Sequence, residues 1–278
     1  MTKKALLIGI NYKNTKNELN GCINDIQNIK SFLSTNCDYN SDNICVMTDE
    51  EELLPTRSNI EDKIEWLVSN NSKGDTLFFY YSGHGSYVRD LNKDESDGKD
   101  ECMIPLDYET SGEILDDWLF SNMISKISTG ISLYCFTDCC HSGTIMDLQY
   151  NCKSLCQYKK SDAKNCKNYV PTDWTDKYSF SVEPSKKVKG NVVLFSGCQD
   201  KETSADAYIK SKSQSQGAFT FCLLEILNNN LDKKNKLKKL KLRNILKEVN
   251  CLLDINGYDQ NSQLSTGKLN WIDKTFDI

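Results

Sequence analysis

The stretch "TLFFYYSGHG", residues 76–85, places six strand-forming residues ahead of a histidine that stands between two glycines. A run that is apolar on both faces is typical of a parallel strand covered on both sides. His84 follows directly after this run, where the flanking glycines allow a backbone to approach a ligand closely. A second apolar run, "ISLYCFTDCCHSG" at residues 131–143, ends in two cysteines and a histidine. The two runs predict neighbouring buried strands with chemically active residues at their ends.

Segments of helical periodicity alternate with such runs along the chain. Further strands are predicted at residues 5–10, 44–47 and 192–196. Apolar residues recur at helical spacing in residues 22–33, 60–68, 111–128 and 219–227. Ser58 and Glu61 form a capping box that predicts the start of the second of these helices. This order predicts an α/β fold, in which helices flank a mainly parallel central sheet on both faces.

Composition restricts the class of partner. The net charge of −5 gives no general reason to expect nucleic acid or an anionic membrane. Residues 233–247 are strongly basic, and they are better interpreted as a solvated amphipathic helix than as a nucleic-acid contact. The chain has neither a signal-peptide core nor a run of about 18 apolar residues that would span a bilayer. We therefore expect an intracellular, cytoplasmic protein.

The 13 cysteines are an odd number in a chain without an export signal, which favours reduced thiols over a disulfide framework. Most of them lie within apolar runs, where cysteine acts as a small hydrophobic residue. Cys152, Cys156 and Cys166 are clustered in a polar stretch, and a zinc site there is the alternative to surface thiols.

The chain has only two histidines, His84 and His141, and both follow the carboxyl end of a predicted strand. In open α/β sheets, reactive groups collect at this edge. A cysteine nucleophile needs a base from a different part of the chain. His141 is a poor base for its neighbour Cys140, because adjacent side chains diverge. The pattern predicts a Cys–His dyad with His84 as the base.

Several motifs, taken in order, resemble those of the metacaspases, caspase-like cysteine peptidases of plants, fungi and protists. They are GCINDI (21–26) after ALLIGINY (5–12), SGHG (82–85), DGKDE (97–101), ILDDW (114–118), DCCHSG (138–143), FSGCQDKETSADA (195–207) and QNSQLSTG (260–267). The resemblance implies a caspase-like fold and a cysteine endopeptidase. It makes Cys140 the nucleophile, with Cys139 in the place of a serine, and His84 the base. The backbone N–H groups of Gly85 and Cys140 would form the oxyanion hole.

The resemblance also implies a substrate preference. Metacaspases cleave after Arg or Lys, which requires a pocket with carboxylates. By motif, Asp25 and Asp138 are the acidic residues of this S1 pocket, and Cys22 and Ser82 line it. Asp138 lies two residues before the nucleophile and so points to the same face of the strand. An acidic pocket excludes the Asp specificity of caspases, whose pocket is basic.

Calcium is the cofactor that the resemblance implies. Its ligands would be Asp100, the pair Asp116 and Asp117, and Asp147. Carboxylates gathered in one place repel each other unless a cation neutralises them. An EF-hand at residues 90–101 is rejected, because Glu95 stands where that loop requires glycine and flanking helices are not expected.

We expect three parts: a large-subunit-like part at residues 1–150, a polar linker at 151–190, and a small-subunit-like part at 191–278. The linker carries lysines at which such a peptidase could cut itself: Lys159, Lys160, Lys164, Lys167, Lys186 and Lys187. Because the chain starts almost at its first strand, we expect a type I-like member without the N-terminal prodomain. We expect a monomer that acts on proteins or peptides with a basic P1 residue, with no nucleic-acid or membrane partner.

Three other hypotheses compete with this one. A legumain-like or gingipain-like peptidase is disfavoured by the GCIND and ILDDW motifs. A catalytically silent, caspase-like scaffold has no need of both His84 and Cys140. A zinc-binding interaction module would depend on the clustered cysteines.

Overall fold

A central sheet of eight strands organises the computed structural model, which describes residues 1–90, 98–154, 178–182, 186–199, 204–209 and 213–278. Its strands are β1 (Lys3–Gly9), β2 (Ile44–Thr48), β3 (Thr76–Ser82), β7 (Ser132–Asp138), β8 (Tyr150–Ser154), β9 (Tyr178–Val182), β10 (Asn191–Ser196) and β14 (Gln263–Thr266). They are ordered β2-β1-β3-β7-β10-β14-β8-β9. The first five run parallel, and each later strand is antiparallel to the strand before it in this order. The predicted mainly parallel sheet is confirmed.

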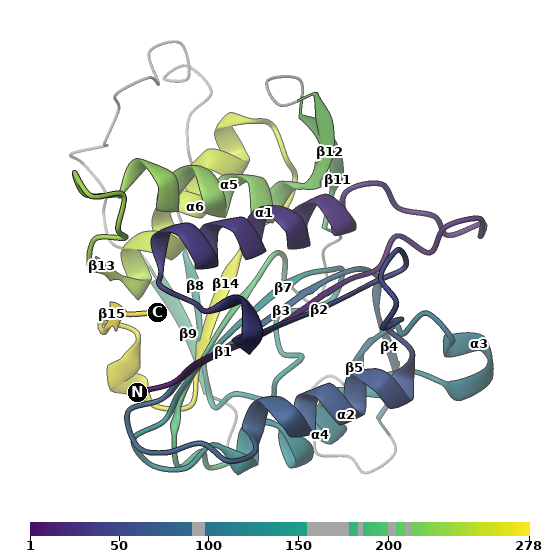
Figure 1. Cartoon of the computed structure of the whole chain (residues 1–278), viewed down its shortest axis with the longest axis horizontal. Coiled ribbons are helices and arrows are strands. Elements are labelled where there is room, and N and C mark those ends of the chain that lie inside the picture. Colours follow the sequence, from purple (N-terminus) through teal and green to yellow (C-terminus); the bar gives the residue numbers. More distant parts are fainter. Residues whose placement is uncertain (91–97, 155–177, 183–185, 200–203, 210–212) are drawn as a thin grey trace.

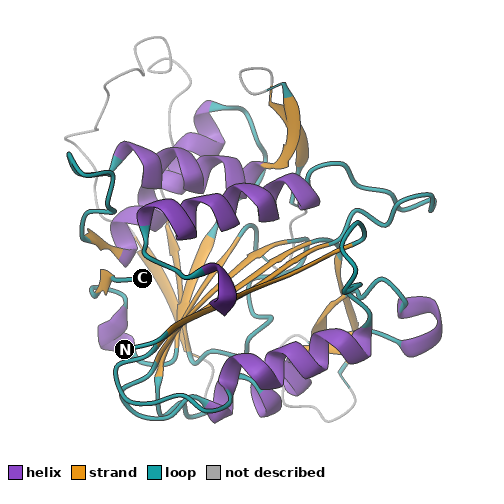
Figure 2. Ribbon diagram, viewed as in Figure 1, coloured by secondary structure: helices purple, strands orange, loops and turns teal. Residues whose placement is uncertain are grey.

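Helices cover both faces of this sheet (Figure 1). One face is packed by α1 (Cys22–Asn36), α5 (Ala218–Asn229) and α6 (Leu242–Ile255), and the other by α2 (Arg57–Val68) and α4 (Asp116–Asn122). Strand β1 shows why: Ala5 and Leu7 belong to the core under α1, whereas Leu6 and Ile8 belong to the core under α2. A strand buried on both faces has no polar alternation, as its sequence predicted. The α/β class is confirmed (Figure 2).

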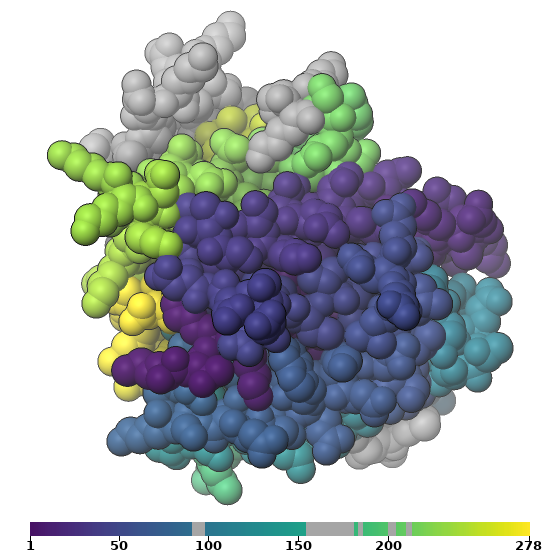
Figure 3. All heavy atoms as spheres, viewed as in Figure 1, coloured from purple at the N-terminus to yellow at the C-terminus, as the bar shows by residue number. Residues whose placement is uncertain are grey.

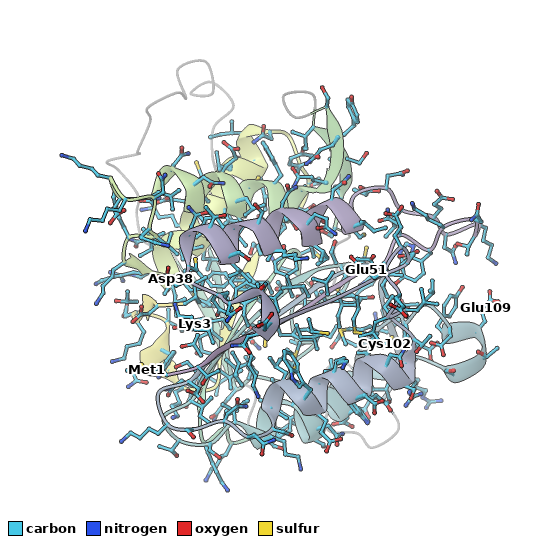
Figure 4. All side chains as sticks on the ribbon, in the orientation of Figure 1. Met1, Lys3, Asp38, Glu51, Cys102 and Glu109 are labelled. Carbon is cyan, nitrogen blue, oxygen red and sulfur yellow. The ribbon has the colours of Figure 1, made fainter. Side chains whose placement is uncertain are left out.

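Smaller elements surround this framework. The short sheets consist of β4 (Gly85–Arg89), β5 (Lys99–Met103) and β6 (Ile114–Leu115); β11 (Asp206–Ile209) and β12 (Gln214–Gly217); and β13 (Leu240–Lys241) and β15 (Thr275–Phe276). Helical turns are α3 (Tyr108–Ser111) and the 3-10 segments Ser41–Asn43, Ile124–Lys126 and Leu269–Trp271. Strands β4 and β5, not helices, flank the acidic segment at residues 90–101, which agrees with the rejection of an EF-hand. Cys102 of β5 is buried in the layer that also holds α2 (Figure 4).

Three predicted helix boundaries were wrong. Helix α2 is capped by Thr56, whose side chain accepts from the Asn59 N–H, so Ser58 lies within the first turn. The region 111–128 is not one helix, because Gly112 (φ +75°) ends α3 and Ile114 pairs with β5 before α4 begins. Helix α6 begins at residue 242, after most of the basic segment 233–247.

Two segments of the linker at residues 151–190 form strands: β8 covers its start, and β9 lies at residues 178–182. β8 and β9 pair with each other at the edge of the central sheet. Cys152 packs in the core there, which explains how a polar stretch is held to the sheet. Cys156, Cys166, Lys159, Lys160, Lys164 and Lys167 lie outside the described residues. No disulfide joins any of the eleven cysteines in the described ranges.

The two termini lie close together (Figure 1), and the Lys3 ammonium donates to the carbonyl oxygen of Ile278 at 3.1 Å. On the face shown in Figure 3, the N-terminal third of the chain through α1 and α2 forms most of the surface. Across the described ranges, no helix combines the length and apolar character that crossing a membrane requires.

Candidate active site

The register of β3 against β7 brings the two predicted catalytic residues to one edge of the sheet. Ser82 pairs with Asp138 at the carboxyl ends of these parallel strands. His84 and Cys140 each lie two residues beyond that pair. The Gly83 N–H donates to the Asp138 carbonyl at 3.3 Å, so the two chains remain adjacent after the strands end.

Gly85 allows the close approach of the two segments. A Cβ at this position would collide with the carbonyl oxygen of Cys140 and lie 3.1 Å from the Cys139 sulfur. Any larger residue would therefore push the histidine segment away from the cysteine segment. The glycine after His84 is thus required by packing at the place where the oxyanion hole is expected.

The His84 ring is oriented by a backbone carbonyl. Its Nε2 lies 2.7 Å from the carbonyl oxygen of Asn17. A carbonyl only accepts, so Nε2 carries the proton of the neutral ring and Nδ1 is left as the basic nitrogen. This partner has no side-chain signature, and the sequence did not reveal it.

Tyr12 contacts both the backbone and the ring of His84. The backbone N–H of His84 donates to the Tyr12 hydroxyl at 3.0 Å, and that hydroxyl donates to the Ile104 carbonyl at 2.6 Å. The two rings lie against each other with centroids 4.7 Å apart. Tyr12 is 1% exposed and has a φ of +50°, an uncommon backbone conformation for a bulky residue. Tyr81 adds a second anchor by donating to the His84 carbonyl at 2.7 Å.

The two adjacent cysteines differ in environment. Cys139 is buried, and burial raises the pKa of its thiol well above the usual value, which makes it unreactive. Cys140 is partly exposed; burial also raises its pKa, although the N–H of Ser204 opposes the shift. His141 has a φ of +52° and contacts the Tyr87 ring edge-on, with centroids 5.1 Å apart. Of the two thiols, that of Cys140 is the accessible one.

Asp25 lies beside this strand edge in the first turn of α1. Its side chain is 0% exposed, accepts from the Ser82 hydroxyl at 2.8 Å and accepts from the Gly217 N–H at 3.1 Å. Burial and the charge of Asp138 raise the pKa of this carboxyl well above its usual range. Cys22 is buried one helical turn away, and burial and Asp25 raise the pKa of its thiol.

Asp138 completes a pair of buried carboxylates. It accepts from the Thr220 N–H at 2.9 Å, from the Thr220 hydroxyl at 2.6 Å and from the Ser204 hydroxyl. Burial raises its pKa in spite of these bonds. The structure therefore brings together Cys22, Asp25, Ser82 and Asp138, the four residues that the sequence assigned to the S1 pocket.

The sequence did not identify three residues that lie around these two carboxylates. A Cβ on Gly217 would collide with Asp138 and lie 2.9 Å from an oxygen of Asp25, so only a glycine can pack this closely against both carboxylates. Thr220 holds Asp138 from α5. Asp206 accepts from the Asn20 N–H at 2.6 Å and adds a third negative charge that raises the pKa of both pocket carboxyls.

The residues predicted to bind calcium lie on three segments that meet near the segment after the nucleophile. Asp116 is buried and accepts from the N–H groups of Glu101 and Asp117, at 2.7 Å each. Burial, followed by the charge of Asp147, raises the pKa of Asp116 to about 8. Asp100 is also buried and precedes Glu101 in β5.

Asp117 and Asp147 share one cation, the ammonium of Lys186, which lies 2.6 Å from an oxygen of each. The sequence did not associate this lysine with the acidic cluster. Hard carboxylate oxygens of this kind suit calcium, and a positive charge already lies between two of them. In the arrangement described for residues 1–90, 98–154 and the later ranges, no three acidic, His or Cys side chains are set to hold a metal.

Glu101 ties this cluster to the nucleophile's loop. Its carboxylate accepts from the Thr144 hydroxyl at 2.7 Å, and the Asp147 N–H donates to the Thr144 carbonyl at 2.7 Å. Residues 144–147 follow Cys140 closely in the chain. Hydrogen bonds thus connect the acidic cluster, through Glu101 and Thr144, to the segment that follows Cys140.

A cavity of about 770 Å³ lies at the opposite end of the sheet, lined in part by Gln149, Lys187 and Leu269. The Gly267 in its wall follows the end of β14, which is antiparallel to β10, so the cavity lies at the amino ends of the parallel strands. It contains none of the predicted catalytic or pocket residues.

Comparison with known sequences gives consistent matches. The family model for the metacaspase, peptidase C14 domain matches residues 3–149. A Metacaspase-1 of Arabidopsis thaliana is 37% identical over 81% of this chain and 59% of its own length. The Metacaspase-1 of Mycosarcoma maydis is 36% identical, over 95% of this chain and 70% of its own length. This chain thus spans less than two thirds of the Arabidopsis relative.

Solved structures agree on the fold. A crystal structure of a Geobacter sulfurreducens protein superposes with a TM-score of 0.63 at 24% identity, over 99% of this chain and 97% of the other. Caspase-1 from Spodoptera frugiperda superposes with a TM-score of 0.52 at 10% identity, over 95% and 85% of the two chains. At these identities the likeness shows a caspase-like fold.

Proposed function

Because the chain belongs to the metacaspase family, we propose that it is a cysteine endopeptidase that cleaves after Arg or Lys and is activated by calcium. The observation that carries the proposal is the placement of His84 and Cys140 just beyond the paired residues Ser82 and Asp138. A histidine and a thiol from different parts of the chain thus lie on adjacent segments, beside two buried carboxylates.

The mechanism begins with the neutral Cys140 thiol, since burial raises its pKa. His84 accepts the thiol proton at Nδ1, and the sulfur attacks the scissile carbonyl carbon. The hydrogen bond from Nε2 to the Asn17 carbonyl stabilises the imidazolium that forms. The N–H groups of Gly85 and Cys140 would stabilise the oxyanion.

The imidazolium then donates its proton to the leaving amine, and the C–N bond breaks to give a thioester on Cys140. His84, neutral again, accepts a proton from water as that water attacks the thioester. Collapse releases the carboxylic acid product and returns the proton to the sulfur. The same nitrogen serves as base and acid in both halves, so no further titrating group is needed.

The S1 preference follows from charge. Asp25 and Asp138 are enclosed, and their hydrogen-bond partners among the described residues are hydroxyl and N–H groups rather than cations. A guanidinium or ammonium that reached these two carboxylates would neutralise both, and arginine could bind a carboxylate through two parallel hydrogen bonds. An aspartate side chain would add a further negative charge and be rejected.

Calcium would be held by Asp116, Asp117 and Asp147, with Asp100 adjacent, and would supply charge neutralisation to that cluster. The link from Glu101 to Thr144 provides a route by which such neutralisation would affect the segment after Cys140. Self-cleavage in the linker is proposed from its lysines.

The direct test is cleavage of fluorogenic peptides that end in Arg, Lys or Asp, with calcium or with a chelator. We expect cleavage of the Arg and Lys peptides in calcium and none of the Asp peptide. Cleavage of the Asp peptide alone, or equal rates with chelator, would contradict the specificity or the calcium part respectively.

Tyr12→Phe is expected to lower kcat about tenfold, because the backbone N–H of His84 loses its acceptor while the contact between the rings of residues 12 and 84 stays. KM should change little, since Tyr12 does not line the pocket. Steady-state kinetics beside Tyr208→Phe, an exposed tyrosine on β11, checks this. An unchanged kcat, or an equal loss in the control, would show that the hydroxyl does not position the histidine.

The raised pKa values of Asp25 and Asp138 predict how binding depends on pH. At low pH, protonation of Asp25 and Asp138 removes their negative charge and weakens the attraction for a basic side chain. The affinity for an Arg peptide should therefore rise with pH. Binding should also release a proton, because the guanidinium favours the charged carboxylates. Calorimetry of the Cys140→Ala variant with an Arg peptide, in buffers of different ionisation enthalpy, measures that proton. A binding enthalpy that does not depend on the buffer would count against an acidic S1 site.

A further inference from the structure

The Lys186 ammonium lies between two acidic side chains of the proposed calcium site. It is 2.6 Å from Asp117 and 2.6 Å from Asp147. The Lys186 side chain is 16% exposed and that of Asp147 is 5% exposed. Ion pairs that are this enclosed are screened less by solvent and salt than surface pairs.

The surrounding charge explains why a cation lies there. Asp116 is buried nearby and is influenced by the charge of Asp147. The backbone N–H of Asp147 donates to the Thr144 carbonyl, which closes a turn, and Asp147 itself has a φ of +48°. Without a positive partner, these fixed carboxylates would repel each other.

An ammonium and a calcium ion cannot share this position. Calcium binds carboxylate oxygens at about 2.3–2.6 Å, so a calcium ion bound to the same oxygens of Asp117 and Asp147 would lie where the Lys186 nitrogen now lies. Two cations at that distance would also repel strongly. Occupancy of the position by lysine and by calcium is therefore mutually exclusive.

We infer that Lys186 is an intramolecular competitor for the calcium site, and that calcium binds by displacing its side chain. The inference rests on the proposed function for the calcium ligands. It has two consequences. The apparent calcium affinity is lower than the carboxylates alone would provide, and calcium turns an enclosed lysine into an exposed one.

The neighbouring lysines provide internal controls. Lys187 and Lys189 lie in the same segment, and both are exposed. Neither is paired with Asp117 or Asp147 in the ion pairs of the cluster. A change confined to position 186 thus separates displacement of one side chain from a general change in the linker.

The first experiment is acetylation of the full chain carrying Cys140→Ala, which cannot cut itself, read residue by residue by mass spectrometry. Without calcium we expect Lys186 to be acetylated about tenfold more slowly than Lys187, because its ammonium is enclosed and paired with two carboxylates. An effect of about tenfold lies within the usual range of coupling between two binding events. With calcium, Lys186 should approach the rate of Lys187, which should not change. Magnesium, which adopts stricter geometry, is the control ion.

The second experiment is calcium titration by calorimetry of Lys186→Gln and Lys187→Gln, both in the Cys140→Ala chain. Removing the competitor should tighten calcium binding about tenfold, whereas Lys187→Gln should leave it within about twofold. Equal affinities together with unchanged acetylation of Lys186 would overturn the inference and leave the calcium proposal standing. No calcium binding by either variant or by the parent Cys140→Ala chain would overturn both the inference and the calcium proposal. Cleavage of Arg peptides by the chain with Cys140 intact would still test the peptidase.

Discussion

Cys140→Ala is expected to abolish cleavage of Arg and Lys peptides, with a loss in kcat of at least about 10³-fold, since the bond-forming sulfur is removed. Its neighbour should behave differently. Cys139→Ser is expected to retain most activity, because Cys139 is buried and its raised thiol pKa keeps it protonated. Peptide cleavage in calcium, with thermal denaturation as a check of folding, measures both variants.

The pair of variants also separates the hypotheses. If Cys139→Ser is inactive and Cys140→Ala is active, the nucleophile is Cys139. If the chain with both cysteines intact cleaves none of the peptides in calcium, the silent-scaffold hypothesis gains over the peptidase. Labelling with iodoacetamide adds an independent measure: Cys140 should be alkylated before the buried Cys139, and faster as pH rises through its raised pKa.

Asp25→Asn is expected to lower kcat/KM for Arg peptides by about 10²-fold or more, because half of a buried charge pair is lost. Stability should not fall, since burial and Asp138 make the Asp25 charge costly, and asparagine keeps an acceptor for Ser82 and Gly217. Losing activity without losing stability is the signature of a substrate contact rather than a structural one.

The matched control is Asp62→Asn, an exposed aspartate on α2 at the other face of the sheet. It removes the same charge without touching the pocket, and we expect less than a twofold change in kcat/KM. Assays on Arg, Lys and neutral peptides complete the test. If Asp25→Asn cleaved Arg peptides at the normal rate, another carboxylate, with Asp206 nearest to consider, would have to bind the basic side chain.

The strands of the sheet were predictable because burial on two faces leaves a direct mark on sequence. Residues 77–81 and 133–136 are continuous apolar runs, and each lies within a parallel strand. Helix boundaries were less predictable, because a cap depends on local backbone geometry that several nearby residues could adopt. Thr56, not Ser58, has the extended conformation that α2 requires. Strands β8 and β9 were missed, because β9 is the edge strand, where polar residues are tolerated, and β8 beside it has a largely polar sequence.

The positions of His84, Cys140, Asp25 and Asp138 were also predictable, from motifs at strand ends and at a helix start. The groups that complete their surroundings were not. The carbonyl of Asn17, which orients His84 from 67 residues away, leaves no mark on the sequence because every residue has one. Gly217 and Lys186 are common residues whose neighbours, Asp138 and Asp147, are distant in the chain.

The sequence by itself determined that the chain forms an α/β sheet with a histidine and a cysteine at the ends of adjacent strands. The spacing of apolar residues along the chain shows whether a segment forms a helix or a strand buried on both faces. This spacing is given directly by the residue order. The tertiary structure decided which of the two thiols is accessible, which ring nitrogen of His84 is free, and which cation lies among the carboxylates. Each of these depends on a desolvation or a hydrogen bond between segments that meet only when the chain folds.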